Sequence, residues 1–216
     1  MSLILSAIPV VLKGLGMTLK ITAASALIGM LFGMLTGVGR TVGPKWVKWP
    51  LSVWIEIIRG TPLYTQLLLV VFGLPQLLGH SVDEFWMGVL TIGLNSSAYV
   101  AEIFRGGIQS IDKGQMEGAR SLGLSVGQAM RTVILPQAFR RVIPPLVNEL
   151  VMLVKESSLV ASIALVEVTR MATINASRTF KPFPSYVAAG LVYLVLTLTL
   201  SRLAGWLERR LSVDAR

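Results

Sequence analysis

Residues 112–136 read DKGQMEGARSLGLSVGQAMRTVILP, a polar segment between two long apolar ones. Asp112 and Ser125 are each followed three residues later by a glutamine, a pattern typical of a capped helix N-terminus. Gly123 lies between them, and glycine permits the left-handed backbone conformation that often ends a helix. The pattern therefore predicts two short helices joined at a glycine.

These two helices are expected over residues 113–122 and 126–135, and Pro136 is expected to end the second one. They lie within a connection, residues 106–142, that is too long for a simple turn and too polar to cross a membrane. A helix–glycine–helix unit of this kind fits two interpretations. It can form a protruding knob that binds a partner, or an amphipathic hairpin that lies on lipid headgroups.

Long uncharged segments flank this connection. A helix needs about 20 mostly apolar residues to cross the hydrocarbon core of a membrane. Four segments without Lys, Arg, Asp or Glu are close to that length, namely 21–39, 60–82, 85–101 and 182–201. A fifth segment, 144–166, is long enough but carries three charged residues, so it is expected to face protein or water rather than lipid.

Composition agrees with a membrane protein. Only 14% of the residues are charged, against about 25% in soluble domains. A net charge of +9 in so apolar a chain favours a membrane protein with its positive charges on one side over a nucleic-acid-binding protein. The chain is therefore predicted to be an all-α membrane protein with about five transmembrane helices in one domain, residues 1–216.

Positive charges predict the orientation. Five spans place the two termini on opposite sides of the membrane. The loop after the first span carries Arg40, Lys45 and Lys48, the segment 105–141 carries six Lys or Arg residues, and four follow the last span. All three groups fall on one side, which the positive-inside rule assigns to the cytoplasm. The N-terminus is therefore predicted to be extracytoplasmic and the C-terminus cytoplasmic.

Two features of the first spans predict how they pack. Ser25, Gly29, Gly33 and Gly37 recur every four residues and form a stripe of small residues, which allows another helix to approach closely. Pro62 lies inside the second span, where it is expected to kink or interrupt the helix.

The polar connection resembles a known motif. Three residues separate the tripeptide Glu117-Gly118-Ala119 from Gly123, and nine more precede the segment Val133-Ile134-Leu135-Pro136. This spacing resembles the EAA motif of ABC importer permeases, with Gly118 in place of the middle alanine and Val133 in place of isoleucine. Segments 59–62 (RGTP), 95–102 (NSSAYVAE) and 155–159 (KESSL) look like the polar amino acid branch of that family.

The resemblance implies a type I ABC importer permease in the bacterial cytoplasmic (inner) membrane, with no catalysis of its own. It implies four kinds of partner: a cytoplasmic ABC ATPase dimer, an identical or paralogous second permease, an extracytoplasmic solute-binding protein and an amino acid substrate. ATP and Mg²⁺ would bind to the ATPase, and no cofactor is expected on this chain. In that family the motif docks on the ATPase, so the residues implied to couple to it are Glu117, Gly118, Ala119, Arg120, Gly123, Leu135 and Pro136.

Polar residues inside the predicted spans are candidates for substrate contact, because polar groups at membrane depth are costly and usually functional. One polar helix face carries Asn95, Tyr99 and Glu102, another carries Asn148, Glu149, Met152, Lys155 and Glu156, and the two are expected to meet in a polar seam. The candidate substrate-binding residues are Asn95, Ser96, Tyr99, Glu149, Lys155 and Thr61.

Structural roles compete with substrate contact at several of these positions. Lys155 and Glu156 could neutralise each other or pair with partner spans, and Glu102 is expected to pair with Arg105 or another loop cation. Glu149 can pair with an α-ammonium group or a basic side chain, which tilts the predicted substrate toward basic amino acids. Neutral or acidic polar amino acids and cystine-like compounds remain alternatives.

Other classes of protein fit the sequence poorly. The chain has no cysteine and one histidine, His80, which leaves little for thiol or imidazole chemistry. It lacks the HExxH and GxSxG patterns of hydrolases and the phosphate-binding loop of ATPases, so ATP would be hydrolysed by a partner. An ATP-independent channel or carrier is a remote alternative that would leave the EAA motif unexplained.

Overall fold

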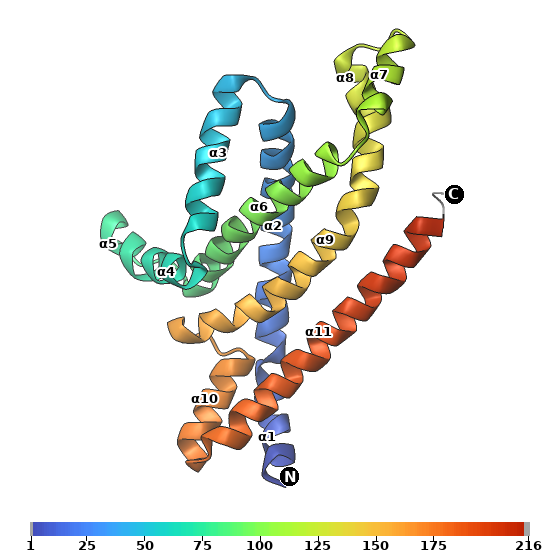
Figure 1. The fold of residues 1–216 in the computed structure, drawn as a ribbon. Coiled ribbons are helices and arrows are strands. Elements are labelled where there is room, and N and C mark those ends of the chain that lie inside the picture. The colour runs from blue at the N-terminus through green and yellow to red at the C-terminus, as the bar shows by residue number, and fades with distance from the viewer. Residues whose placement is uncertain (1, 214–216) are drawn as a thin grey trace.

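The computed structural model describes the backbone of residues 2–213 and the side chains of residues 2–206. The described chain folds into a bundle of long helices with a short helical unit at one end (Figure 1). The helices in chain order are α1 (Ser2–Val11), α2 (Leu15–Val42), α3 (Lys45–Gly60), α4 (Leu63–Leu68), α5 (Leu74–Leu78), α6 (Glu84–Gln109), α7 (Lys113–Ser121), α8 (Val126–Ala129), α9 (Leu135–Glu156), α10 (Val168–Thr179) and α11 (Pro182–Val213).

Among the described residues, three helical segments are long and apolar enough to cross a membrane: Ser2–Val42, which joins α1 to α2, then α6, and α11 as far as Trp206. The bent pair of α3 with α4 and α5 is a fourth candidate. α9 supplies the fifth long helix and packs against α6 and α11. The predicted all-α membrane architecture is confirmed, while the sides on which the termini lie stay a prediction.

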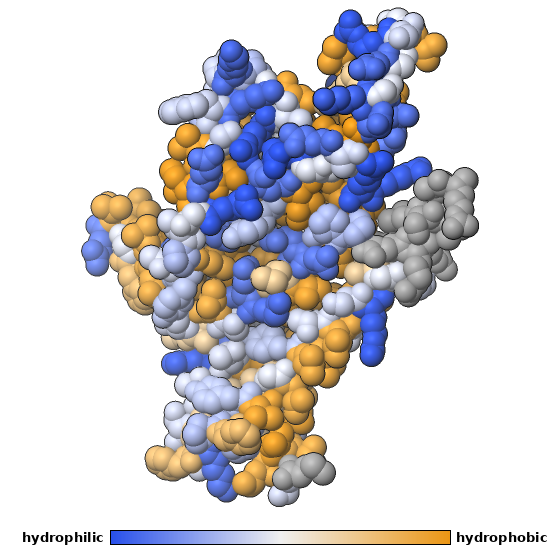
Figure 2. Space-filling model, in the orientation of Figure 1, coloured by the Kyte–Doolittle hydropathy of each residue, from blue (hydrophilic) through white to orange (hydrophobic). Residues whose placement is uncertain are grey.

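Surface hydropathy follows the long axis of the bundle. Hydrophilic side chains gather at the end that carries α7 and α8, whereas hydrophobic side chains cover much of the lower part of α11 (Figure 2). α1 lies at the end opposite to α7 and α8 (Figure 1). Three of the four cations predicted to follow the last span, Arg209, Arg210 and Arg216, lie outside the described side chains.

The small-residue stripe of α2 packs against α6, as predicted. Ser25 is buried and its Oγ donates a hydrogen bond to the carbonyl of Val89, 3.1 Å away. Gly29, Gly33 and Gly37 are buried in the same interface. A Cβ placed at Gly33 would lie 2.5 Å from the Cβ of Val100, closer than two carbon atoms can approach. Because these three glycines have no side chain, α2 and α6 can pack this closely.

The second predicted span, 60–82, covers only the second arm of a broken helix pair, so its predicted start is wrong. α3 already begins at Lys45, and the chain is extended at Thr61 and Pro62 before α4 starts. The axis turns by 101° at this break. The expected interruption at Pro62 is confirmed, and its physical reason is that proline holds the preceding residue out of the helical conformation.

Pro136 does not end a helix, contrary to the prediction. α8 continues through a π-helical turn, Met130–Ile134, directly into α9. In this wider turn the N–H of Leu135 bonds to the carbonyl of Met130, five residues earlier. A π turn changes the hydrogen-bond register of the helix locally, which lets it pass a proline that has no N–H to donate.

The predicted span 144–166, which is the fourth in chain order, also differs from the structure. α9 ends at Glu156, and a 3₁₀ helix, Ser157–Ile163, follows it. Ala164 then adopts the left-handed conformation, with φ of 65°, and the chain turns toward α10. Sequence hydropathy identified this apolar segment correctly but not the break inside it, because apolar content does not depend on backbone conformation.

Candidate functional site

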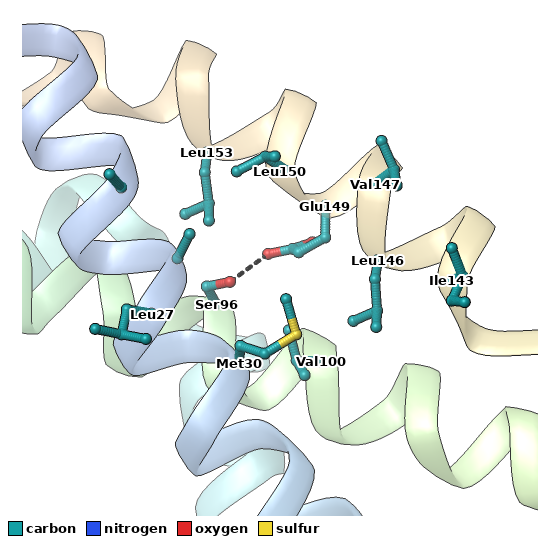
Figure 3. A pocket seen from close by; sticks show the side chains of 12 residues that line it. Leu27, Met30, Ser96, Val100, Ile143, Leu146, Val147, Glu149, Leu150 and Leu153 are labelled. Atoms are coloured by element: carbon teal, nitrogen blue, oxygen red, sulfur yellow. Dashed lines mark hydrogen bonds between the residues drawn. The ribbon is translucent and has the colours of Figure 1, made fainter. Parts of the chain in front are cut away.

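Glu149 lies in a cavity of about 460 Å³ between α2, α6 and α9 (Figure 3). α9 supplies the carboxylate, and Ser96 on α6 donates a hydrogen bond to it with an Oγ–Oε1 distance of 2.7 Å. Almost all other side chains that line the cavity are apolar, and they include Leu27, Met30, Val100, Leu146, Val147, Leu150 and Leu153. The cavity therefore presents one carboxylate and one hydroxyl in an apolar wall.

This arrangement leaves most of the hydrogen-bonding capacity of Glu149 free. An ionised carboxylate has about four acceptor positions, and Ser96 fills one of them. A negative charge against apolar side chains is stabilised when a positive charge or several donors approach it. The cavity is thus suited to a ligand that brings a cationic group and an apolar stem.

Asn95 does not line this cavity but contacts the bend between α3 and α4. Its side chain is buried, and its Nδ2 donates to Oε1 of Gln66, 2.9 Å away. Gln66 in turn donates to the carbonyl of Ile58 at 2.8 Å and to the hydroxyl of Thr61 at 2.7 Å. The Thr61 hydroxyl donates to the carbonyl of Ile57. Gln66 therefore ties the two arms of the bend to α6, a role that sequence analysis missed.

We expect Gln66→Ala to loosen this bend. The variant leaves the buried Asn95 amide without its partner, and an unsatisfied buried polar group costs about 1–3 kcal/mol. The purified protein should unfold at a temperature several degrees lower in a detergent melting assay, while its membrane insertion is unchanged. Thr65→Ala, one residue earlier on α4, is the control, and an equal loss in both variants would contradict the role of Gln66.

The expected polar seam between the two helix faces does not form. Asn95 points toward α4, and Tyr99 lies under the guanidinium of Arg59 on α3, 5.2 Å from the ring centre. Ser96, one position further along α6, is the residue that reaches Glu149. The side chains of successive residues point in directions about 100° apart around a helix. Asn95, which faces α4, and Ser96, which faces α9, therefore lie on different sides of α6.

Glu102 pairs with Arg105 as predicted, through nitrogen–oxygen contacts of 2.9 and 2.6 Å. Arg40 on α2 also pairs with this carboxylate, and Arg59 on α3 approaches it at 3.9 Å. One carboxylate thus ties together α2, α3 and α6. Its three arginine partners indicate a structural junction rather than a substrate contact.

The remaining substrate candidates are spread over the structure. Lys155 is exposed and does not line the Glu149 cavity. The Thr61 hydroxyl forms its hydrogen bonds within the bend, to Ile57 and Gln66. The structure therefore joins Ser96 to Glu149, and Asn95 to Thr61 through Gln66, as two separate groups. A substrate role for any of these residues stays a prediction.

The polar connection forms a protruding helix–turn–helix knob, residues 112–129. The Asp112 side chain accepts a hydrogen bond from the N–H of Gly114, and Ser125 and Gln128 form the expected reciprocal capping box. Gly123 has φ of +84°, the left-handed conformation that the sequence predicted. The N–H of Leu124 bonds back to the carbonyl of Ala119 at 3.2 Å, which closes the end of α7.

Most of the residues implied to couple to a partner lie on the surface of the knob. Glu117, Gly118, Arg120 and Gly123 are exposed, whereas Ala119 is buried and holds α7 against the rest of the unit. Leu122 is 84% exposed at the tip, and an apolar side chain this exposed on a polar knob marks a contact surface. Leu122 was not among the predicted coupling residues, because an apolar residue at the end of a helix gives no sign in the sequence that it is exposed.

Comparison with known proteins places this geometry in a family. Residues 29–213 match the family described as "Binding-protein-dependent transport system inner membrane component". The chain belongs to this family. This permease is therefore a multi-pass inner-membrane protein, and its family works with a solute-binding protein and an ABC ATPase.

Individual relatives cover almost all of the permease. It is 44% identical over 204 residues to the arginine transport system permease protein ArtQ of Bacillus subtilis, covering 94% of this chain and 93% of that protein. It is 39% identical over 213 residues to the glutamine transport system permease protein GlnP of Escherichia coli, covering 98% of this chain and 97% of that protein.

Solved structures agree with the fold. A crystal structure of an amino acid ABC transporter with histidines matches with a TM-score of 0.89 and 45% identity, covering 94% of each chain. The MetNI methionine ABC transporter in an inward-facing conformation matches with a TM-score of 0.79 at 17% identity, over 94% of this chain and 96% of that chain, and supports the fold alone.

Proposed function

We propose that this permease forms the translocation path of an ATP-driven importer of polar amino acids and that basic amino acids are its preferred substrates. The observation that carries the proposal is the Glu149 carboxylate in an otherwise apolar cavity. A basic amino acid brings a cation on an apolar stem, and both parts have a counterpart in this cavity. Its volume falls within the range of about 300–1,000 Å³ that is usual for small-ligand pockets.

Relatives support two substrate classes. ArtQ is named for arginine transport and GlnP for glutamine transport. The α-ammonium group common to all amino acids could pair with Glu149 as well as a basic side chain could, so neutral polar amino acids are the second candidates. Uptake measurements with arginine, lysine, glutamine and glutamate in proteoliposomes that hold the whole importer distinguish these classes. Preferred uptake of glutamate would contradict the role of the cavity carboxylate.

The permease is proposed to be non-catalytic, with its knob inserted in a groove of the ATPase that binds ATP and Mg²⁺. Glu117, Arg120 and Leu122 are all exposed on the knob, which therefore presents charged side chains together with an apolar one. Affinity purification of the tagged chain from its native membrane, followed by mass spectrometry, should recover an ABC ATPase. Failure to recover one in mild detergent, with and without an ATP analogue, would contradict this part of the proposal.

We expect Gly123→Val to reduce recovery of the ATPase by about tenfold while the permease still inserts into the membrane. Valine at a φ of +84° is strained by roughly 1–2 kcal/mol, so the turn that presents Leu122 is remodelled. Gly106→Val is the matched control, because a side chain at this α6 position meets nothing within 4 Å. Normal recovery of the ATPase with Gly123→Val would show that the knob geometry is not needed for docking.

A further inference from the structure

A second cavity, of about 390 Å³, lies in the bend between α3 and α4. Its walls come from α3, from α4 and the π turn after it, and from α6, and they include Trp54, Ile57, Leu69 and Leu94. Ile57 is 57% exposed and Leu69 is 70% exposed, so the cavity opens to the surface of the described chain. It shares no lining residue with the Glu149 cavity and is a separate site.

This bend cavity offers apolar contacts to a ligand. The hydroxyls of Thr61 and Thr91 donate to carbonyls four residues earlier, and the Gln66 side chain is held by its bonds within the bend and to Asn95. No charged residue lines the cavity in the part of the chain that the structure describes. A polar amino acid would lose its hydration here without new partners, whereas a hydrocarbon chain gains by leaving water.

The depth of the bend cavity follows from the length of α3, which is the first arm of a broken membrane span. At 1.5 Å per residue, Ile58 at the cavity lies about 15 Å along the helix from Lys48 in its first turn. Half of a hydrocarbon core of about 30 Å has the same length. Trp46 and Trp49, beside Lys48, are 78% and 73% exposed, and tryptophan is enriched at the level of the lipid headgroups. The cavity therefore lies one lipid leaflet away from the headgroups on the side of the knob.

An apolar stripe on α3 joins these two levels. Trp46, Pro50, Val53 and Ile57 follow one another at intervals of four, three and four residues, which places them on one face of the helix. Val53 is half-buried and the other three are exposed. Glu56, the exposed acidic residue of α3, is rotated by about 100° from Ile57 and does not line the cavity. The stripe is thus an open apolar path from the headgroup level to the cavity.

The headgroup end of the stripe is positively charged. Lys45 is exposed and Lys48 is half-buried, and α3 has no acidic residue in its first turn. Neither lysine forms an ion pair with the described side chains, those of residues 2–206. Their flexible stems allow the ammonium groups to reach the headgroup level, and basic segments beside a membrane attract anionic lipid headgroups.

We propose that an anionic phospholipid binds along α3, with its phosphate at Lys45 and Lys48, one acyl chain on the apolar stripe and the end of that chain in the bend cavity. The positive charge, the apolar path and its length of one leaflet each match a part of this ligand. The acyl chain contacts both arms of the bend and so supports the turn that Gln66 holds. The site is independent of the proposed substrate, because the two cavities share no residue.

Fluorescence quenching locates the acyl chain. The sequence has no cysteine, so Leu69→Cys gives the full chain a single thiol in the cavity wall, to which a fluorophore is attached. The labelled protein is placed in phosphatidylcholine vesicles that contain a small fixed fraction of nitroxide-labelled lipid, with the nitroxide near the end of the acyl chain. We expect labelled phosphatidylglycerol to quench several-fold more strongly than labelled phosphatidylcholine. Ile57→Cys repeats the measurement from the other arm of the bend.

Two controls separate a site from general contact with lipid. Val195→Cys, 63% exposed on α11, should be quenched equally by the two labelled lipids. In the Leu69→Cys background, Lys45→Gln combined with Lys48→Gln should remove the preference for phosphatidylglycerol. Lys13→Gln combined with Lys181→Gln removes the same charge from exposed positions at the end opposite to the knob and should leave the preference intact (Figure 1).

Three results would overturn the proposal. Absence of quenching at Leu69→Cys and Ile57→Cys alike, with normal quenching at Val195→Cys, would show that another protein surface covers the cavity. Equal quenching by the two labelled lipids at Leu69→Cys would show that the headgroup is not recognised. Equal loss of the preference in both double lysine variants would show attraction to the net charge of the protein rather than binding at α3. The test uses neither an amino acid nor the ATPase, so its outcome is separate from that of the importer proposal.

Discussion

Glu149→Gln is expected to lower the uptake of arginine and lysine by at least about tenfold, which corresponds to roughly 1.4 kcal/mol of lost interaction. Glutamine keeps the size of the side chain and can still accept the hydrogen bond from Ser96. It removes the negative charge that the proposed substrate cation would meet in an apolar cavity. The effect should therefore fall on transport, with little change in the amount of folded permease.

The measurement is uptake of labelled amino acids into vesicles that contain the complete importer, with the ATPase recovery of each variant determined in parallel. Glu84→Gln is the matched control, because Glu84 is an exposed carboxylate in the first turn of α6 and lies far from the cavity. If Glu149→Gln transports every tested amino acid as well as the unmodified protein, Glu149 does not belong to the substrate site.

Gly33→Val is expected to give the largest loss of folded protein. The first carbon of any side chain at this position would lie 2.5 Å from the Cβ of Val100 and 2.7 Å from the carbonyl oxygen of Ser97. The second contact is with backbone, which cannot rotate away. Overpacking in a close-packed core costs about 1–3 kcal/mol or more, so α2 and α6 must separate.

The separation would also break the hydrogen bond from Ser25 to the Val89 carbonyl. We expect the yield of monodisperse protein after detergent extraction to fall at least about fivefold, as measured by size-exclusion chromatography. Gly16→Val, in the same helix but with nothing within 4 Å of the new side chain, should extract normally. An unchanged yield with Gly33→Val would show that the two helices pack less closely than the structure indicates.

Local signals in the sequence were sufficient for the knob and for the α2 interface. Asp112, Gly123 and the Ser125 capping box act over three or four residues, so their geometry follows from neighbours in the chain. The stripe at Gly29, Gly33 and Gly37 predicted close packing because only glycine leaves room for it, although the sequence could not say that α6 is the partner.

Predictions failed where backbone geometry depends on distant contacts. An interruption at Pro62 was expected, but the 101° turn at this break was not, and it is held by Gln66 of α4, which bonds to Ile58 of α3 and to Asn95 of α6. Pro136 was expected to end a helix, but a π turn carries the helix past it. Neither outcome is visible in hydropathy, because hydropathy records composition and not hydrogen-bond register.

Charge-free length, capping residues and motif spacing are properties of local chain segments, so they were enough to predict an all-helical membrane permease with a capped helical knob. Which polar groups meet depends on how the helices pack. Ser96 reaches Glu149 while its neighbour Asn95 turns to Gln66, since one residue rotates a helix by about 100° and the packing of α6 fixes the direction of each. The cavity around Glu149 exists only because three helices far apart in the chain converge on it.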